Sequence, residues 1–266
     1  MFDSIAGDYD ALNHILSLDV DKIWRKKALK QIVDAPAPVQ VLDLACGTGD
    51  FSIAIAKALS RSHKRVGTPI EAHVKAPAKA PVEAQVTSTG FVTGDSGRSD
   101  LMTKGHVTGV DLSEGMLAVM REKVQKAGLT EMISIEEGDG ENLRFPDNTF
   151  DRVTIAFGIR NFEDRPKGLR EMLRVLKPGG RLVILELSRP ENKVIRWFYD
   201  LYFLHILPKI GGKVSGDKAA YAYLPASVAA FPGKKAFMAT MREAGFRTVT
   251  HKAFTLGICR MYTGEK

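Results

Sequence analysis

The residues most capable of chemistry lie in a short glycine-containing turn between Asp43 and Asp50. The turn follows a run of valine and leucine that predicts a buried strand, and Gly47 and Gly49 stand one residue apart within it. Glycine lets the backbone turn tightly and approach a ligand at a point where a Cβ atom would clash. A strand, an acid near its end and such a turn are typical of a site for a nucleotide-like cofactor. We therefore expect Asp43, Gly47 and Gly49 to belong to a cofactor site.

A second acid, Asp111, ends the next predicted strand and is a candidate for binding a ribose. A carboxylate at this place accepts hydrogen bonds from ribose hydroxyls, and it usually follows the glycine turn by about 20 residues. Asp111 instead lies 62 positions after Gly49, and the intervening segment 60–105 is rich in small residues and proline. Such a segment has little to bury, so we interpret it as a low-complexity, disordered insertion. Without it, the spacing falls to 16 positions.

The residues around the turn distinguish between two classes of cofactor. Dinucleotide sites usually carry a third glycine beneath the pyrophosphate, but Ser52 stands at that position, and the acidic Asp50 would repel a phosphate. S-adenosylmethionine carries a sulfonium and an amino group and no phosphate, so acids at the strand ends suit it better. Asp139, which precedes Gly140, follows the third predicted strand and could accept a hydrogen bond from an adenine amino group. The alternative is that these acids only cap helices and end strands.

Strands and helices alternate along most of the chain, which predicts a parallel sheet with helices on both faces. We expect strands at 39–44, 107–111, 133–137, 150–157 and 181–187, with two more extended runs between 246 and 262. The expected helices are 19–33, 51–59, 113–127, 166–176 and 234–244. Val20, Ile23, Trp24 and Ile32 fall at helical spacing on the apolar face of the first, and Ser113 is expected to cap the third. The fold class is therefore α/β, with a seven-stranded, mostly parallel sheet in a single domain over residues 1–266.

The composition excludes several classes of protein. The hydrophobic fraction is 44% and the charged fraction 26%, as in globular proteins, and no apolar run reaches the ~20 residues that span a bilayer. No basic region followed by an apolar core begins the chain, so we expect no secretory signal. Cys46 and Cys259 indicate reduced thiols, and no cysteine–histidine spacing fits zinc, so we expect no metal. The net charge is +7, and its densest basic cluster, Lys22–Lys30, is either the solvated face of a helix or a membrane-binding surface.

Several runs of the sequence together carry a resemblance to a known family. They are Met1–Ala6, Tyr9–Asn13, Trp24-Arg25, Ala45–Asp50, Phe145–Asp151, Phe157–Phe162, Arg174–Arg181 and Tyr221–Leu224. In these runs the chain resembles the C-methyltransferases of ubiquinone and menaquinone biosynthesis, which usually carry residues upstream of the position of Met1. The glycine turn and the Leu-Lys-Pro-Gly-Gly run are common to many methyltransferases, whereas Phe157–Phe162 and the N-terminal pattern are more specific.

That resemblance implies a Rossmann-like class I methyltransferase fold and S-adenosyl-L-methionine as the methyl donor. It implies the ring carbon of a demethylated prenyl quinol, such as demethylmenaquinol, as the acceptor, and it does not separate the menaquinone from the ubiquinone pathway. The family's cofactor-binding positions fall on Thr48, Asp111, Asp139 and Gly140. The aromatic segment 190–233 is then expected to be an insertion on the substrate side.

Two candidates for catalysis follow the fourth predicted strand. Arg160 could stabilise a developing oxyanion, and Asn161 could orient the hydroxyl group of the acceptor. Arginine is a poor general base, because its pKa stays above about 12. The alternative for Arg160 is a structural ion pair with Glu186 or Asp164.

The aromatic segment supplies further candidates. His205 is a candidate acid–base residue, as are Tyr202 and Tyr221, although a lone histidine is more often structural. Some apolar side chains of this segment either line a tunnel for the isoprenoid tail or pack in an ordinary core. They are Trp197, Phe198, Tyr202, Phe203 and Leu207.

These observations predict a cytoplasmic enzyme that makes peripheral contact with the inner face of a membrane and acts on a polyprenyl quinol. We expect no nucleic-acid partner, because the chain has no basic stripe and no Asn-Pro-Pro-Tyr-like run. Two alternatives remain. One is a methyltransferase that acts on another small molecule or lipid, and the other is a non-catalytic scaffold that binds S-adenosylmethionine.

Overall fold

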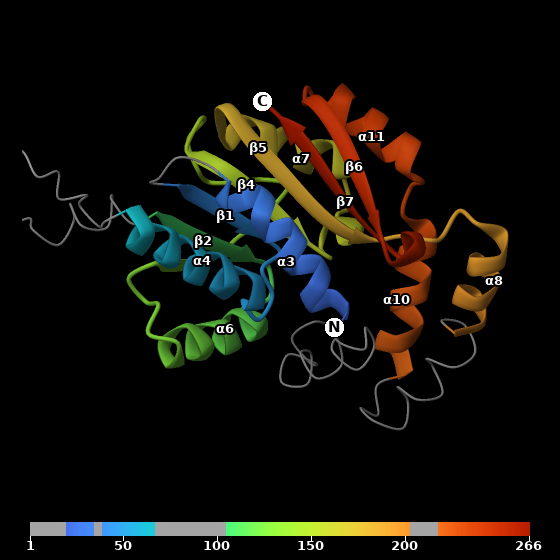
Figure 1. Ribbon diagram of the computed structural model, residues 1–266, viewed down its shortest axis with the longest axis horizontal. Helices are drawn as coiled ribbons and strands as arrows, with labels where there is room; N and C mark the ends of the chain where they lie inside the picture. Colours follow the sequence, from blue (N-terminus) through green and yellow to red (C-terminus); the bar gives the residue numbers. More distant parts are fainter. Residues whose placement is uncertain (1–19, 35–38, 67–104, 203–217) are drawn as a thin grey trace, which may run out of the picture.

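The computed structural model describes residues 20–34, 39–66, 105–202 and 218–266, and these build one seven-stranded sheet (Figure 1). The strands are β1 (Gln40–Leu44), β2 (His106–Asp111), β3 (Ile133–Glu137), β4 (Phe150–Ala156), β5 (Leu176–Leu187), β6 (Arg247–Phe254) and β7 (Cys259–Glu265). Their order in space is β3-β2-β1-β4-β5-β7-β6. The first five strands are parallel, and β7 runs antiparallel to both β5 and β6. The predicted seven-stranded, mostly parallel sheet is therefore confirmed.

Helices cover both faces of this sheet, as predicted (Figure 1). They are α3 (Val20–Val33), α4 (Asp50–Val66), α6 (Glu114–Lys126), α7 (Arg165–Val175), α8 (Lys193–Leu201), α10 (Lys218–Ala230) and α11 (Lys234–Glu243), with short 3-10 turns η1 (Ile159–Asn161) and η3 (Thr255–Gly257). Helices α3, α4 and α6 pack on one face, and α7 and α11 pack on the other. No helix in the described part of the chain is long and apolar enough to span a bilayer.

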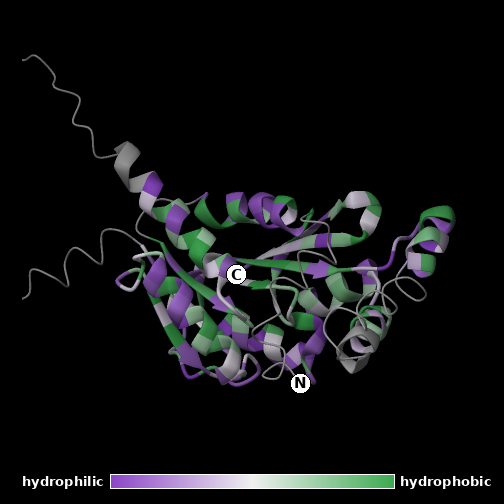
Figure 2. Cartoon of the chain, turned by 90° about the horizontal axis from the view of Figure 1, so that it is seen from below, coloured by the Kyte–Doolittle hydropathy of each residue, from purple (hydrophilic) through white to green (hydrophobic). Residues whose placement is uncertain are grey.

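The strands form this two-sided core because successive side chains point to opposite faces. In β1, Leu42 and Leu44 join the cluster under α7 and α11, whereas Val41 joins the cluster under α3, α4 and α6. In β5, Leu182 and Val183 divide in the same way. Figure 2 shows the hydrophobic residues concentrated along these central strands. Continuous apolar runs, rather than alternating ones, are what a sheet buried on both faces requires.

The structure corrects several expected details. Helix α4 continues to Val66, so the first residues assigned to the insertion 60–105 are helical, and residues 67–104 lie outside the described part. Ile23, expected on the apolar face of α3, is 54% exposed, whereas Trp24 and Ile32 are buried as expected, together with Asp21. The predicted cap of α6 is confirmed, because the Ser113 hydroxyl accepts a hydrogen bond from the backbone N–H of Met116 at 3.2 Å. The segment 190–233 contains two helices, α8 and α10, that periodicity did not predict.

The order of the strands creates a switch point beside β1, where the chain changes direction across the sheet. The chain proceeds from β1 to β2 and β3 on one side, and returns to place β4 on the other side of β1. In open α/β sheets, ligands bind outside the carboxyl ends of the strands at this switch point. The carboxyl ends of β1, β2 and β4 are therefore the place to look for a site.

Candidate active site

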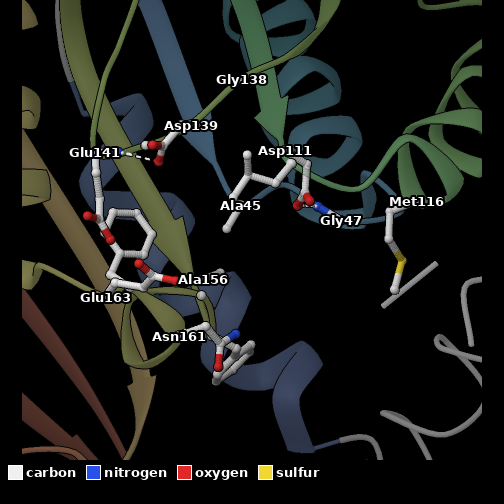
Figure 3. A pocket seen from close by; sticks show the side chains of 15 residues that line it. Ala45, Gly47, Asp111, Met116, Gly138, Asp139, Glu141, Ala156, Asn161 and Glu163 are labelled. Carbon is white, nitrogen blue, oxygen red and sulfur yellow. Dashed lines mark hydrogen bonds between the residues drawn. The ribbon is translucent and has the colours of Figure 1, made fainter. Parts of the chain in front are cut away.

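A cavity of about 340 Å³ lies at the carboxyl ends of β1, β2, β3 and β4 (Figure 3). Each strand contributes through the loop that follows it. The lining residues are Ala45 and Gly47 after β1, Asp111, Leu112 and Met116 after β2, Gly138–Glu141 after β3, and Ala156–Gly158 and Asn161–Glu163 around the end of β4. Four residues predicted to bind a cofactor thus line one cavity, although they come from three separate parts of the sequence: Gly47, Asp111, Asp139 and Gly140.

The Asp111 carboxylate is fixed by two backbone donors. Its Oδ2 accepts a hydrogen bond from the N–H of Gly47 at 2.8 Å, and its Oδ1 accepts one from the N–H of Ser113 at 2.9 Å. The side chain therefore joins the glycine turn to the start of α6 and faces the cavity in a set orientation (Figure 3). Each carboxylate oxygen can accept a second hydrogen bond, so the arrangement suits the ribose-binding role predicted for Asp111.

The loop after β3 owes its path to a glycine. A Cβ atom at Gly140 would lie 2.6 Å from Cζ of Phe162, which is closer than real Cβ contacts come. The neighbouring Asp139 accepts a hydrogen bond from the N–H of Glu141 at 2.8 Å, which holds its carboxylate at the cavity wall (Figure 3). Gly140 therefore allows close packing against Phe162. The cofactor contact that the sequence predicts for Gly140 is a separate function.

The cavity is lined by acidic groups. Four carboxylates, those of Asp111, Asp139, Glu141 and Glu163, line it, and no lysine or arginine of the described residues does. Such a lining attracts a cation and repels a phosphate. The residues present therefore fit a ligand that carries a sulfonium and an amino group, and they do not fit a pyrophosphate.

A second, smaller cavity of about 40 Å³ holds two other predicted cofactor residues, Asp43 and Thr48. Asp43 is 1% exposed and accepts a hydrogen bond from the Ser52 hydroxyl at 2.5 Å. Burial raises the pKa of this carboxyl group to about 7, against the lowering effects of Ser52 and of the nearby Arg25 charge. The Thr48 hydroxyl accepts a hydrogen bond from Nζ of Lys123 at 3.0 Å. Cofactor contact by Asp43 and Thr48 remains a prediction.

Gly49, also predicted to contact a cofactor, lines neither cavity. Its φ is +83°, and a Cβ atom there would lie 2.4 Å from Cγ of Met120 on α6. The structure therefore gives Gly49 a packing function, in which it lets the turn lie directly on α6.

The charge of Asp50 is offset within the protein, which the sequence did not indicate. Its carboxylate lies 2.8 Å from Nζ of Lys123 and 3.4 Å from Nη1 of Arg25, so two cations offset its charge. Asp50 therefore repels an anion less than its position at a helix start implied. The case against a pyrophosphate rests instead on the four carboxylates of the larger cavity.

The backbone is strained where the two central strands end. Ala45 after β1 has a φ of 49° and Phe157 after β4 has a φ of 63°, and both line both cavities. Such conformations cost non-glycine residues about 1–3 kcal/mol each and often mark functional sites. A Cβ atom at Gly158 would lie 2.5 Å from Cβ of Ala45, so the two turns touch. Sequence reasoning had no signal for this strain.

Arg160 forms the structural ion pair with Glu186 that was the alternative to a catalytic function. It lies in η1, is 8% exposed and does not line either cavity. Its Nη1 lies 2.9 Å from Oε1 of Glu186, a residue with no exposed surface, and its Nε donates to the Ser227 hydroxyl at 3.3 Å. Nη1 also donates to the carbonyl oxygen of Phe157. The guanidinium therefore holds together β4, β5 and α10, and direct contact with an acceptor remains only a prediction.

Asn161 lies in the cavity lining, as a residue that orients an acceptor must (Figure 3). Its Oδ1 accepts a hydrogen bond from the hydroxyl of Tyr223 on α10 at 2.9 Å. Sequence reasoning favoured Tyr202 and Tyr221 and missed Tyr223, whose only signal was its place in the run Tyr221–Leu224. His205 and the side chain of Tyr221 lie outside the described residues.

Comparison with known proteins identifies the family. The model of the ubiE/COQ5 methyltransferase family matches residues 1–266. The chain belongs to this family. It is therefore a methyltransferase with S-adenosylmethionine as its methyl donor, which agrees with the acidic lining of the larger cavity.

Curated relatives match the chain over its whole length. A Geobacter sulfurreducens protein named ubiquinone/menaquinone biosynthesis C-methyltransferase UbiE is 43% identical, and 87% of it is covered. Proteins named demethylmenaquinone methyltransferase from Deinococcus radiodurans and Bacteroides fragilis are 42% and 40% identical, with 91% of each covered.

Solved structures agree on the fold. A putative S-adenosylmethionine-dependent methyltransferase from Methanococcus maripaludis has a TM-score of 0.59 at 16% identity, covering 100% of this chain and 94% of that one. A S-adenosylmethionine-dependent methyltransferase from Aquifex aeolicus has a TM-score of 0.53 at 19% identity, covering 90% and 88%. The predicted Rossmann-like class I methyltransferase fold is confirmed.

Proposed function

We propose that this chain methylates the ring carbon of a demethylated prenyl hydroquinone, as in the conversion of demethylmenaquinol to menaquinol. The observation that supports this most strongly is that relatives named demethylmenaquinone methyltransferase match the whole chain at 40% and 42% identity. The cavity at the switch point of the sheet supplies the residues for such a reaction.

The donor site is assigned to the acidic side of the larger cavity. Asp111 accepts hydrogen bonds from the ribose, and Asp139 accepts one from the adenine amino group. When bound there, S-adenosylmethionine supplies an electrophilic methyl group and its sulfur leaves as a thioether. The four carboxylates of the lining stabilise a cationic donor until the methyl group is transferred.

The acceptor is an electron-rich ring carbon, which forms the new carbon–carbon bond and loses its proton. Asn161 orients the neighbouring ring hydroxyl. The Tyr223 hydroxyl donates to Oδ1 of Asn161 and so fixes the amide plane. The amide N–H groups have no other hydrogen-bond partner in the described part of the chain, and they are left to donate to the acceptor oxygen. Correct placement of two reactants can lower a reaction barrier by about 7–11 kcal/mol.

Arg160 acts indirectly in this proposal. Its backbone N–H donates to Oε2 of Glu186 at 3.1 Å, and its side chain bonds to Oε1 of the same carboxylate. Both bonds hold η1 in place, so they also hold Asn161, the last residue of that turn. Arg160 is therefore a positioning residue for Asn161.

An assay of methyl transfer tests the proposal. The protein is incubated with labelled S-adenosylmethionine and either reduced demethylmenaquinone or a reduced, demethylated ubiquinone precursor in detergent. We expect label in at least one prenylated product, with mass spectrometry placing the methyl group on the ring carbon. Tight cofactor binding by calorimetry, together with no transfer to either quinol, would contradict the proposed acceptor.

We also propose that α8 contacts the membrane in which such a substrate resides. Val194, Trp197 and Phe198 on this helix are 65%, 61% and 60% exposed, which leaves large apolar side chains in solvent. Helix α8 lies at one end of the molecule, where Figures 1 and 2 show it projecting beyond the sheet. Lys193, at the start of the helix, is also exposed, and a cation beside exposed aromatic residues suits an anionic lipid surface.

The basic cluster Lys22–Lys30 is less suited to this function. Arg25 is turned inward, whereas Lys22, Lys26, Lys27 and Lys30 are exposed. The only large apolar side chain exposed beside these lysines on α3 is Ile23, so this helix offers less apolar surface to a membrane than α8 does.

Vesicle sedimentation tests the membrane contact. Trp197→Ser combined with Phe198→Ser should reduce binding to anionic phospholipid vesicles several-fold. Ile23→Ser, which removes a similarly exposed residue from α3, should not. Equal binding by all three proteins would contradict the assignment to α8.

A further inference from the structure

The smaller cavity continues the larger one past the glycine turn. Ala45, Gly47, Ala156 and Phe157 line both. The larger cavity holds the two acids assigned to the nucleoside, Asp111 and Asp139. The smaller cavity lies at the start of α4, beneath the turn. A ligand that extends from the larger cavity past Gly47 would enter it.

A single cation faces this space. Arg25 on α3 lines the smaller cavity, and it is the only lysine or arginine among the described residues that lines either cavity. Its guanidinium carbon lies 5.7 Å from the ring centroid of Phe157, a residue shared by the two cavities. The sequence runs Trp24-Arg25 at this point, and the proposed reaction has not used either residue.

The hydrogen-bonding capacity of Arg25 is not filled. Nη1 lies 3.4 Å from Oδ2 of Asp50, and Nη2 lies 3.6 Å from Oδ2 of Asp21. Both distances exceed the 2.7–2.9 Å that is usual for a charged N–H···O pair. Nε is buried and has no hydrogen-bond partner, whereas buried polar atoms usually have one. The guanidinium is therefore available to another acceptor.

The donor carries one group that the larger cavity disfavours. S-adenosylmethionine ends in an amino acid, whose carboxylate would be repelled by the four carboxylates of the larger lining. Arginine binds a carboxylate through two parallel N–H donors. The amino group of the same end suits the acidic neighbour Asp43, which also lines the smaller cavity.

We propose that Arg25 binds the carboxylate of the methionyl end of the donor, and that α3 thereby forms part of the cofactor site. This inference rests on the proposed placement of the nucleoside at Asp111 and Asp139. Lys123 is the nearest competing cation, but its Nζ is 2.8 Å from Asp50 and 3.0 Å from the Thr48 hydroxyl, and it lines neither cavity.

Calorimetry with two ligands tests the proposal. S-adenosylmethionine and its decarboxylated analogue differ only in the carboxylate. Arg25→Met should weaken the binding of S-adenosylmethionine about 10- to 100-fold, as expected for loss of a charged hydrogen-bonded pair. It should change the affinity for the analogue by less than about threefold, because no carboxylate contact is lost there. Arg25→Lys, which keeps the charge and loses the fork, should fall between the wild type and Arg25→Met.

Lys123→Met is the matched control, because it removes the other cation beside Asp50. It should leave the ratio of the two affinities unchanged. If Arg25→Met weakens both ligands equally, Arg25 only supports the turn and the inference is overturned. If S-adenosylmethionine does not bind the wild-type protein, the placement of the donor fails as well, which separates the two failures. Thermal unfolding of each variant shows whether it is folded under the conditions of the titration.

Discussion

The buried pair of Arg160 and Glu186 allows the sharpest test of the site. Arg160→Met removes the 2.9 Å ion pair, the bond to Ser227 and the bond to the Phe157 carbonyl. Glu186 then remains fully buried, with only the backbone N–H groups of residue 160 at 3.1 Å and of Leu187 at 2.8 Å as donors. The carboxylate thus loses its only charged partner among the described residues.

The expected loss of stability is large. Removing one member of a buried ion pair costs about 3–5 kcal/mol, because the other charge is left without compensation. A change of 1 kcal/mol moves the melting temperature of a domain of this size by about 2–4 °C, so we expect a fall of roughly 6–20 °C. Arg160→Met combined with Glu186→Leu removes both charges and should recover at least about 2 kcal/mol of this loss.

Urea denaturation of the single and double variants measures these values. Arg170→Met is the control, because Arg170 is exposed on α7, and it should change the unfolding free energy by less than about 0.5 kcal/mol. If Arg160→Met is destabilised by less than about 1 kcal/mol, the structural interpretation is refuted, because a buried ion pair that loses one member costs more than this. Loss of methyl transfer is expected in either case, since Arg160 also positions Asn161.

Three further predictions concern the glycine turn, the buried acid and the residue on α10. Gly49→Ala should lower the unfolding free energy by about 2–4 kcal/mol, through its positive φ and its overlap with Met120. Gly128→Ala, which has a φ of +64° but no neighbour within 4 Å, should cost only about 1 kcal/mol, and equal losses would refute the overlap. Burial raises the pKa of Asp43 to about 7, so its stabilising effect is full below about pH 4 and is lost as the pH rises to about 7. The unfolding free energy of the wild type relative to Asp43→Asn should therefore fall by about 2–3 kcal/mol between pH 5 and pH 8, and a flat difference would contradict the raised pKa. Tyr223→Phe should lower kcat about tenfold and leave the affinity for S-adenosylmethionine unchanged, because it removes the hydrogen bond to Asn161. The control Tyr262→Phe, whose hydroxyl has no hydrogen-bond partner, should change neither value. An unchanged kcat for Tyr223→Phe would show that Asn161 needs no support from α10.

Much of the fold follows from local sequence. The valine and leucine run predicted β1 to within a residue, because a strand buried on both faces is continuously apolar. The predicted bounds of β2 and β3 were also within a residue of those in the structure. Ser113 was recognised as a helix cap because the signal lies within three residues of its partner. Helices α8 and α10 were missed. Helix α8 is strongly amphipathic, so its helical period is present in the sequence and was overlooked. Helix α10 is apolar on most sides and contains Pro225, so it shows no clear helical period.

Part of the site also follows from sequence. Asp111, Asp139 and Gly140 could be found because each directly follows a strand of a parallel sheet, and the carboxyl ends of such strands meet at one edge. Tyr223 could not be found in this way. It comes from a helix far along the chain and reaches Asn161 across 62 positions.

The sequence by itself determined the order of strands and helices, the turn that begins α4 and the acids at the strand ends, since each depends on residues near one another in the chain. Only the tertiary structure decided which charges neutralise one another. Glu186 reaches Arg160 because β5 lies beside β4, and Lys123 reaches Asp50 because α6 packs close to the start of α4. Because of these contacts, Arg160 is a positioning residue and the charge of Asp50 is offset. Arg25 is then the cation that faces the smaller cavity in the described part of the chain. A charge acts on whatever lies within a few ångströms of it, and that neighbour is set by how strands and helices are arranged, which spacing along the chain does not specify.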